Sequence, residues 1–265
     1  MMNLELTSKH VIITGGSKGI GLACARTFLA EGALVTLVSR SKENLRAAQS
    51  ALLKEAPGAT VNIIAADLRD AAEAERAVDA VERDFGTVDV LVNSAGAAKR
   101  TPADELTAAA WHDAMQAKFF TYIHVITPLI KRMGERGHGA VVNIIGAGGK
   151  VAAVTHLAGG AANAALMLAS AGLAAAYAGK GVRVNAVNPG RTFTERLQEG
   201  MQAEARQQDV SVEEAIARAT KSLPLKRFAN PEEIADAVVY LASARASYVT
   251  GALLAMDGAL TQMVV

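Results

Sequence analysis

Seven short apolar runs recur along the chain with helical patterns between most of them, and this alternation constrains the fold more than any other feature. The runs are rich in valine, isoleucine and leucine, as in strands that are buried on both faces. Strands that alternate with helices in this way form a parallel sheet with helices on both faces. The sequence therefore predicts a doubly wound α/β fold with a parallel sheet of about seven strands. The predicted strands are 10–14, 33–39, 60–66, 88–93, 139–145, 182–188 and 252–256.

Nothing in the sequence divides the chain into domains. Its 265 residues contain no linker rich in proline, glycine or serine, no shift in composition and no repeat, so we predict a single domain over residues 1–265. The segment 191–230 is the exception, because it is polar, has a helical pattern and precedes the last helix and strand. Ligands of open α/β sheets bind beyond the carboxyl ends of the strands. We therefore expect this segment to act as a substrate lid.

Charge and cysteine content exclude several classes of protein. The 27 lysines and arginines nearly balance the 26 aspartates and glutamates, so we expect neither a nucleic-acid-binding face nor a membrane-binding surface. No apolar run is expected to reach the roughly 20 residues that span a bilayer. Cys24 is alone and lies in an apolar helical pattern, which predicts a buried thiol and a reducing, cytoplasmic setting. The histidines have no metal-ligand spacing, so no metal site is expected.

The turn after the first predicted strand has the pattern of a phosphate-binding loop. That strand runs into TGGSKGIG (14–21) and then into an apolar helix. Gly15, Gly19 and Gly21 permit a tight turn, close approach of the backbone to a pyrophosphate and close packing of the helix. The N-terminus of the helix would face the phosphates. With a strand before it and a helix after it, the loop predicts a Rossmann-type dinucleotide site rather than an ordinary tight turn.

This loop resembles the cofactor motif of the short-chain dehydrogenase/reductase family, and the resemblance extends over essentially the whole chain. NSAG (93–96) is similar to the family's NNAG motif, NPG (188–190) to its PG motif, and the tail from PEEIADAVVYLAS to MDGA to its ending. The resemblance implies a single NAD(P)-binding Rossmann domain. The cofactor contacts that it implies are Gly15, Ser17, Lys18, Gly19, Ile20, Gly21, Ser39, Arg40, Asp67, Leu68, Asn93, Ala95, Gly96, Pro189, Gly190 and Thr192.

The end of the second predicted strand indicates which nicotinamide cofactor binds. An acidic residue there would bind the ribose hydroxyls of NAD(H). This chain has Ser39 and Arg40 instead, and the guanidinium of Arg40 can hold a 2′-phosphate in a fork geometry. Lys18 in the glycine loop adds a second positive charge. Both cations could also be plain surface residues, but the pattern favours NADP(H) over NAD(H).

The family's catalytic asparagine, serine, tyrosine and lysine are all replaced in this chain. Alignment on the flanking strands places Lys118 at the asparagine position, Gly146 at the serine, Gly159 at the tyrosine and Asn163 at the lysine. In the family, the tyrosine exchanges the carbonyl proton, and the lysine lowers the pKa of that tyrosine and orients the nicotinamide ribose. Glycine has no side chain and an amide does not titrate, so neither role is filled at these positions.

Three residues are candidate substitutes for the family's acid–base groups. Lys118 could act as an acid or base, or form a Schiff base, if a desolvated pocket lowers its pKa. His156 lies three residues before the vacant tyrosine position, and imidazole titrates in the useful range. Lys150 lies on the same loop. Each also has a plainer interpretation, since a lysine can fill space or reach solvent along its stem and a loop histidine is often only hydrogen-bonded.

Two function classes follow. The first is an NADP(H)-dependent oxidoreductase that uses substitute residues on a small carbonyl or alcohol substrate, whose identity the sequence does not specify. The second is a catalytically inactive, cofactor-binding or structural partner in an oligomer of this family. The predicted helix over 157–179 is apolar nearly all round and rich in alanine and glycine. The resemblance implies that helices 4 and 5 of the family, here the helix that carries Lys118 and the helix over 157–179, pair with their copies in a homodimer or homotetramer.

Overall fold

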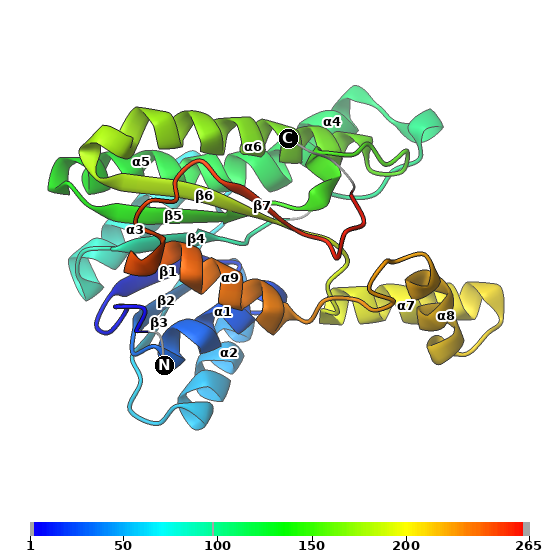
Figure 1. Cartoon of the computed structure of the whole chain (residues 1–265), viewed down its shortest axis with the longest axis horizontal. Coiled ribbons are helices and arrows are strands. Elements are labelled where there is room, and N and C mark those ends of the chain that lie inside the picture. Colours follow the sequence, from blue (N-terminus) through cyan, green and yellow to red (C-terminus); the bar gives the residue numbers. More distant parts are fainter. Residues whose placement is uncertain (1–2, 97, 262–265) are drawn as a thin grey trace.

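The computed structural model describes residues 3–96 and 98–261, and its centre is a parallel sheet of seven strands in the order β3-β2-β1-β4-β5-β6-β7 (Figure 1). The strands consist largely of β-branched and leucine side chains, which suit a sheet that is buried on both faces. The predicted doubly wound α/β fold is therefore confirmed, and each strand lies within one of the predicted runs or within one residue of it. The strands are β1 His10–Thr14, β2 Leu34–Ser39, β3 Val61–Ala65, β4 Val90–Asn93, β5 Gly139–Ile144, β6 Val182–Pro189 and β7 Leu253–Met256.

Helices cover both faces of the sheet (Figure 1). They are α1 Gly19–Ala30, α2 Lys42–Glu55, α3 Ala71–Phe85, α4 Ala108–Ala114, the π-helical turn η2 Met115–Phe120, α5 Thr121–Arg136, α6 Leu157–Tyr177, α7 Glu195–Gln208, α8 Val212–Lys221 and α9 Pro231–Ala242. One apolar core lies between the sheet and α1, α2 and α9, and a second lies between the sheet and α3, α5 and α6. Side chains that accept a backbone N–H fix several helix starts, such as Ser41 before α2 and Asp70 before α3. Cys24 of α1 is fully buried in the first core, as predicted, and burial raises the pKa of its thiol.

The segment 191–230 carries α7 and α8, which extend to one side of the sheet (Figure 1). Its predicted helical character is confirmed. A small apolar cluster of its own, formed by Met201, Leu223 and Phe228, holds the two helices together, and the Phe193 ring stacks on that of Phe228 with 6.2 Å between the centroids. The role of this segment as a lid stays a prediction.

Helix α6 corrects one expectation from the sequence. Among the described residues, Leu157–Lys180 is a helical stretch that is long and apolar enough, by length and composition alone, to cross a membrane. The expectation that no run is that long is wrong, because the many alanines of α6 raise the mean hydropathy without large apolar side chains. Half of the apolar 18-residue window within this stretch is buried inside the molecule, as in the core helix of a globular domain, and α6 packs on η2 and β6.

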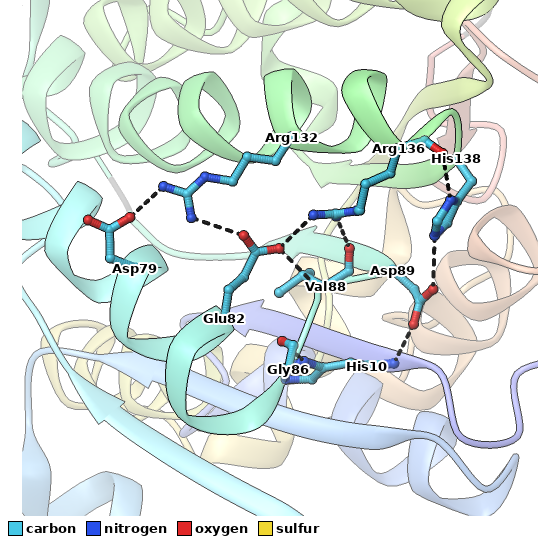
Figure 2. Close-up of polar contacts among 9 residues, drawn as sticks. All are labelled: His10, Asp79, Glu82, Gly86, Val88, Asp89, Arg132, Arg136 and His138. Atoms are coloured by element: carbon cyan, nitrogen blue, oxygen red, sulfur yellow. Dashed lines mark hydrogen bonds and ion pairs between the residues drawn. The ribbon is translucent and has the colours of Figure 1, made fainter.

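A network of paired charges lies where the strands begin (Figure 2). The carboxylate of Glu82 in α3 accepts hydrogen bonds of 2.9 Å from both Arg132 and Arg136 of α5. The carboxylate of Asp89, just before β4, accepts a hydrogen bond of 2.9 Å from the backbone N–H of His10 in β1. These contacts join two helices of one layer to the amino edge of the sheet, opposite the edge at which ligands of such sheets bind.

Candidate cofactor and catalytic site

The order of the strands reverses between β1 and β4, and the loops that follow these two strands are tied together there. The Thr14 hydroxyl donates to Asn93 Oδ1 at 3.2 Å and accepts from the backbone N–H groups of Ser94 at 3.1 Å and Ala95 at 3.2 Å. Thr14 is completely buried, so this arrangement is fixed by the core. Such a switch point is where open α/β sheets bind nucleotides.

The glycines of the first loop are required by close packing. A Cβ atom at position 21 would lie 2.4 Å from the carbonyl oxygen of Gly15, and one at position 15 would lie 2.9 Å from the backbone of Ala95. Gly15 and Gly19 also have positive φ angles of 65° and 56°, which side chains disfavour. At position 96, a Cβ atom would lie 2.0 Å from the carbonyl oxygen of Ala117. The loop is therefore a backbone cradle at the start of α1, as an anion-binding helix N-terminus requires.

Polar groups that suit a ribose phosphate lie where β2 ends. Ser39 Oγ is buried without a hydrogen-bond partner, which in a native protein calls for an explanation such as a bound ligand. Arg40 is exposed beside it. The hydrogen bond from Arg69 holds the pKa of Asp67 below its usual range, and the charge of Arg40 contributes. Lys18, at the N-cap of α1, forms an ion pair of 3.4 Å with Glu195 at the start of α7.

The fold brings every predicted cofactor residue to one edge of the sheet. They follow the carboxyl ends of five strands: 15–21 after β1, 39–40 at β2, 67–68 after β3, 93–96 at β4, and 189–192 at β6. Sequence analysis missed Asn188 as a site residue. This residue is 1% exposed at the end of β6, and neither its amide nitrogen nor its amide oxygen has a partner. The signal that could have identified it is its place directly before the proline and glycine of the PG motif.

The imidazole of His156 occupies the space in front of Gly159, the predicted tyrosine position. A Cβ atom at Gly159 would lie 2.2 Å from Cε1 and 2.5 Å from Nε2 of His156. A Cβ atom at Gly148 would lie 3.4 Å from Cδ2 of the same ring, and one at Gly146 would lie 3.4 Å from Nδ2 of Asn163. Of the four predicted catalytic positions, Gly159 therefore lies directly against the imidazole, and Gly146 faces Asn163. Nδ1 of His156 is buried without a partner.

Lys118 is buried beneath the same site. Its side chain comes from the π-helical turn η2, and such turns are frequent at functional sites. Lys118 Nζ donates hydrogen bonds to Tyr122 Oη at 2.8 Å and to the carbonyl oxygen of Ile144 at 3.1 Å. Burial, followed by the positive charge of Arg196, lowers the pKa of Lys118 from 10.5 to about 7. A neutral amine that donates these two hydrogen bonds keeps its lone pair free to accept a proton.

Two arginines that sequence analysis missed also act on this site. Burial is the largest cause that lowers the pKa of His156, and the positive charges of Arg100, Arg196 and Lys118 add to it. Arg100 lies in the loop after β4, and Arg196 lies in the first turn of α7. Lys150, the third candidate from the sequence, follows the short helical turn Ala147–Gly149 and is not among these charges. Within the described residues, no group of three His, Cys, Asp or Glu side chains could hold a metal ion.

The fold and the site together define an α/β dinucleotide-binding protein with its phosphate loop at the switch point of the sheet. Over residues 15–261 the chain matches the protein family described as enoyl-(acyl carrier protein) reductase. The chain is 35% identical over 262 residues to the D-threitol dehydrogenase of Mycolicibacterium smegmatis, a match that covers 98% of this chain and 95% of that protein. The chain therefore belongs to the short-chain dehydrogenase/reductase family.

Two solved structures are similar over nearly the whole chain. The L-sorbose reductase of Gluconobacter frateurii, complexed with NADPH and L-sorbose, has a TM-score of 0.94 and 29% identity, over 99% of this chain and 100% of that one. An NADPH-bound short chain oxidoreductase of Pseudomonas aeruginosa PAO1 has a TM-score of 0.89 and 31% identity, over 97% of this chain and 100% of that one. The second protein is described as containing an atypical catalytic center.

Proposed function

We propose that this protein is an NADP(H)-dependent oxidoreductase that acts on a small carbonyl or alcohol substrate and in which His156 and Lys118 replace the family's acid–base groups. The observation that carries the proposal is the position of the His156 ring, which fills the space in front of Gly159. The family's tyrosine would begin at Gly159. Glycine is the one residue that admits the imidazole there, so the replacement of the tyrosine and the placement of the histidine support each other.

The residues present fit the cofactor. The glycine cradle at 15–21 and the start of α1 would hold the pyrophosphate, and Ser39 and Arg40 would hold the 2′-phosphate. Asn93, Asn188 and Thr192 would line the side toward the nicotinamide. When bound, NADP(H) supplies or accepts a hydride. Two similar structures hold NADPH, which supports the same cofactor here.

His156 and Lys118 would handle the proton of the substrate oxygen. His156 is only half-buried, so its ring can meet a substrate above Gly159 and give or take the proton there. Lys118 Nζ lies deeper, and its pKa of about 7 suits proton exchange at neutral pH. Tyr122 Oη and the Ile144 carbonyl hold Nζ in place, so its position is set before any substrate arrives.

One observation favours the second candidate function, an inactive cofactor-binding or structural partner in an oligomer of this family. Gly146 and Gly159 remove two catalytic side chains outright, while the cofactor loop remains complete. A protein selected only to hold the cofactor would need the loop and not the catalytic groups. The two functions differ in what a change at His156 does, because only the enzyme loses a reaction.

The direct test of the cofactor proposal is titration calorimetry with NADPH and NADH. We expect NADPH to bind more tightly by about 1–3 kcal/mol, the contribution of charged phosphate contacts. Arg40→Ala should remove most of the difference, and Arg46→Ala, on the exposed side of the neighbouring α2, is the matched control. Equal affinities of the unmodified protein for the two cofactors would refute the preference.

We also propose that the protein is a homodimer or homotetramer through helices α4, α5 and α6. One face of α6 is apolar and exposed in the single chain, with Leu168 78% exposed and alanines beside it. Leu168→Glu should place a charge in that contact and shift the mass in light scattering at micromolar concentration toward the monomer. A monomeric mass for the unmodified protein would contradict this proposal.

The remaining proposals concern organisation and setting. We propose one domain with the segment 191–230 as its substrate lid, because the ion pair of Lys18 with Glu195 joins the start of that segment to the phosphate loop. We propose a reducing, cytoplasmic setting, since the chain has a single, buried cysteine. The nearly balanced charge supports a protein that binds neither nucleic acid nor a membrane surface.

A further inference from the structure

Three positive side chains act electrostatically on the candidate catalytic histidine. Lys118 is buried, whereas Arg100 in the loop after β4 and Arg196 in α7 of the lid segment are exposed. The loop of Arg100 is fixed against the loop of His156, because the backbone N–H of Thr101 donates to the carbonyl oxygen of Thr155 at 3.0 Å. Two residues before Arg100 in the chain, the methyl group of Ala98 would lie 2.8 Å from a Cβ atom at position 159, so the same loop also packs against the start of α6.

The described residues provide no carboxylate to balance these charges. Neither arginine takes part in an ion pair within ranges 3–96 and 98–261, and the partners of Lys118 are a hydroxyl and a carbonyl oxygen. Glu195, next to Arg196 in the chain, pairs instead with Lys18 at 3.4 Å. A cluster of like charges around a partly buried site favours a ligand of the opposite charge, because the ligand removes the repulsion and is itself stabilised.

From this cluster we infer that the substrate carries an anionic group, such as a carboxylate, and that Arg100 and Arg196 bind it beside His156. The inference rests on the proposed oxidoreductase function and names the class of its substrate, a keto acid or hydroxy acid. The reacting carbonyl lies at His156, and the acid group lies between the loop after β4 and α7. Because Arg196 belongs to the lid segment, the same contact draws the lid toward the bound substrate.

Matched pairs of acids and neutral esters test the inference. The probes are 3-oxobutanoate and 4-oxopentanoate with their methyl esters, titrated by calorimetry into the protein with and without NADPH. Charged hydrogen bonds predict that each acid binds about ten- to a hundredfold more tightly than its ester. Arg100→Gln and Arg196→Gln should each remove most of this preference. Arg206→Gln, in the last turn of α7, is the matched control and should retain it.

A second measurement tests, without any substrate, whether the charges of Arg100 and Arg196 act on His156. NMR titration of the His156 ring should give a higher pKa in Arg100→Gln and in Arg196→Gln than in the unmodified protein, and no change in Arg206→Gln. Equal affinity for acid and ester, including undetectable binding of both, overturns the inference, and so does an unchanged pKa of His156. Absence of NADPH binding instead counts against the proposed function, while the acid–ester comparison without NADPH still judges the anion site.

Discussion

The two edges of the sheet differ in whether their charged side chains are paired within the protein. At the amino edge, Glu82 binds both Arg132 and Arg136, and Arg136 also donates to the carbonyl oxygen of Val88 at 2.8 Å (Figure 2). At the carboxyl edge, the positive groups around His156 have no carboxylate partners among the described residues. The orphaned buried polar atoms of Ser39, Asn188 and His156 lie there as well, whereas at the amino edge the one buried side-chain atom without a partner, within the described part of the chain, is Arg136 Nε.

This difference distinguishes charged groups that stabilise the fold from polar groups that a ligand would pair with. A charge that the chain itself neutralises contributes to stability and is complete in the free protein. A buried polar group without a partner costs free energy in the free protein, so it persists where a ligand satisfies it. Changes at the amino edge should therefore alter stability and leave activity unchanged, whereas changes at the carboxyl edge should alter ligand binding or activity.

The largest expected effect is at His156. His156→Gln keeps a polar side chain but removes the titrating ring, so kcat/KM for the substrate reaction should fall by about 10²–10⁴-fold, as for loss of a general acid or base. NADPH affinity should not change, because His156 is not among the predicted cofactor contacts. His112→Gln, on the exposed face of α4, serves as the control. Full activity in His156→Gln would refute a catalytic role for this residue.

A companion variant distinguishes an enzyme with substitute catalytic residues from a protein that has lost catalysis. Gly159→Tyr alone should hinder the site, because its Cβ atom would collide with the His156 ring. Gly159→Tyr combined with His156→Ser, Asn163→Lys and Gly146→Ser restores the family's serine, tyrosine and lysine with space for the tyrosine. If the combined variant reduces ketones while the unmodified protein reduces nothing, the inactive binding partner is the better description.

The next effect concerns Lys118, whose burial makes the stability of the folded protein depend on pH in a definite direction. The unfolded chain keeps an ordinary lysine pKa of 10.5, whereas burial lowers that of folded Lys118 to about 7. Between these values the unfolded state binds the additional proton, so the unmodified protein becomes more stable as the pH rises. Lys118→Met removes this dependence. Its stability relative to the unmodified protein should therefore be greater at about pH 7 than at about pH 9, by about 1–3 kcal/mol in urea unfolding.

An equal stability difference at the two pH values would mean that Lys118 stays charged in the folded protein. Lys131→Met on the exposed surface of α5 is the matched control, because it removes a lysine that is not buried.

The smallest effect is expected at the amino edge. Partial burial acts to raise the pKa of Glu82, but hydrogen bonds from Arg132 and Val88 and the charge of Arg136 lower it below 4.5. Glu82→Gln should lower the free energy of unfolding by about 1–2 kcal/mol at neutral pH. The difference should shrink as the pH falls through the lowered pKa, where Glu82 of the unmodified protein also becomes neutral.

Activity and NADPH affinity should be unchanged in Glu82→Gln if the edges are independent. Glu75→Gln, an exposed position on the same helix, should leave both stability and activity unchanged. A loss of activity in Glu82→Gln at full stability would contradict the separation of the two edges.

Local patterns in the sequence were sufficient for the fold and for the phosphate loop. Each strand could be predicted from an apolar run, because a strand that is buried on both faces needs consecutive apolar residues wherever it lies in the chain. The glycines of 14–21 were readable for a similar reason, since a positive φ or a close backbone contact excludes other residues locally. The expectation failed for Leu157–Lys180, because small side chains give a high mean hydropathy to a helix that is only partly buried.

The sequence by itself determined the family and the cofactor loop, and it predicted that Gly146, Gly159 and Asn163 stand at the family's catalytic positions. Only the tertiary structure decided what fills that space. The His156 ring, Lys118 and Arg196 come from segments far apart in the chain, and the arrangement that brings their charges together depends on how helices and loops pack at one edge of the sheet. Packing also buries Lys118 and so sets its pKa, a property that no local pattern encodes because desolvation depends on every neighbour in space.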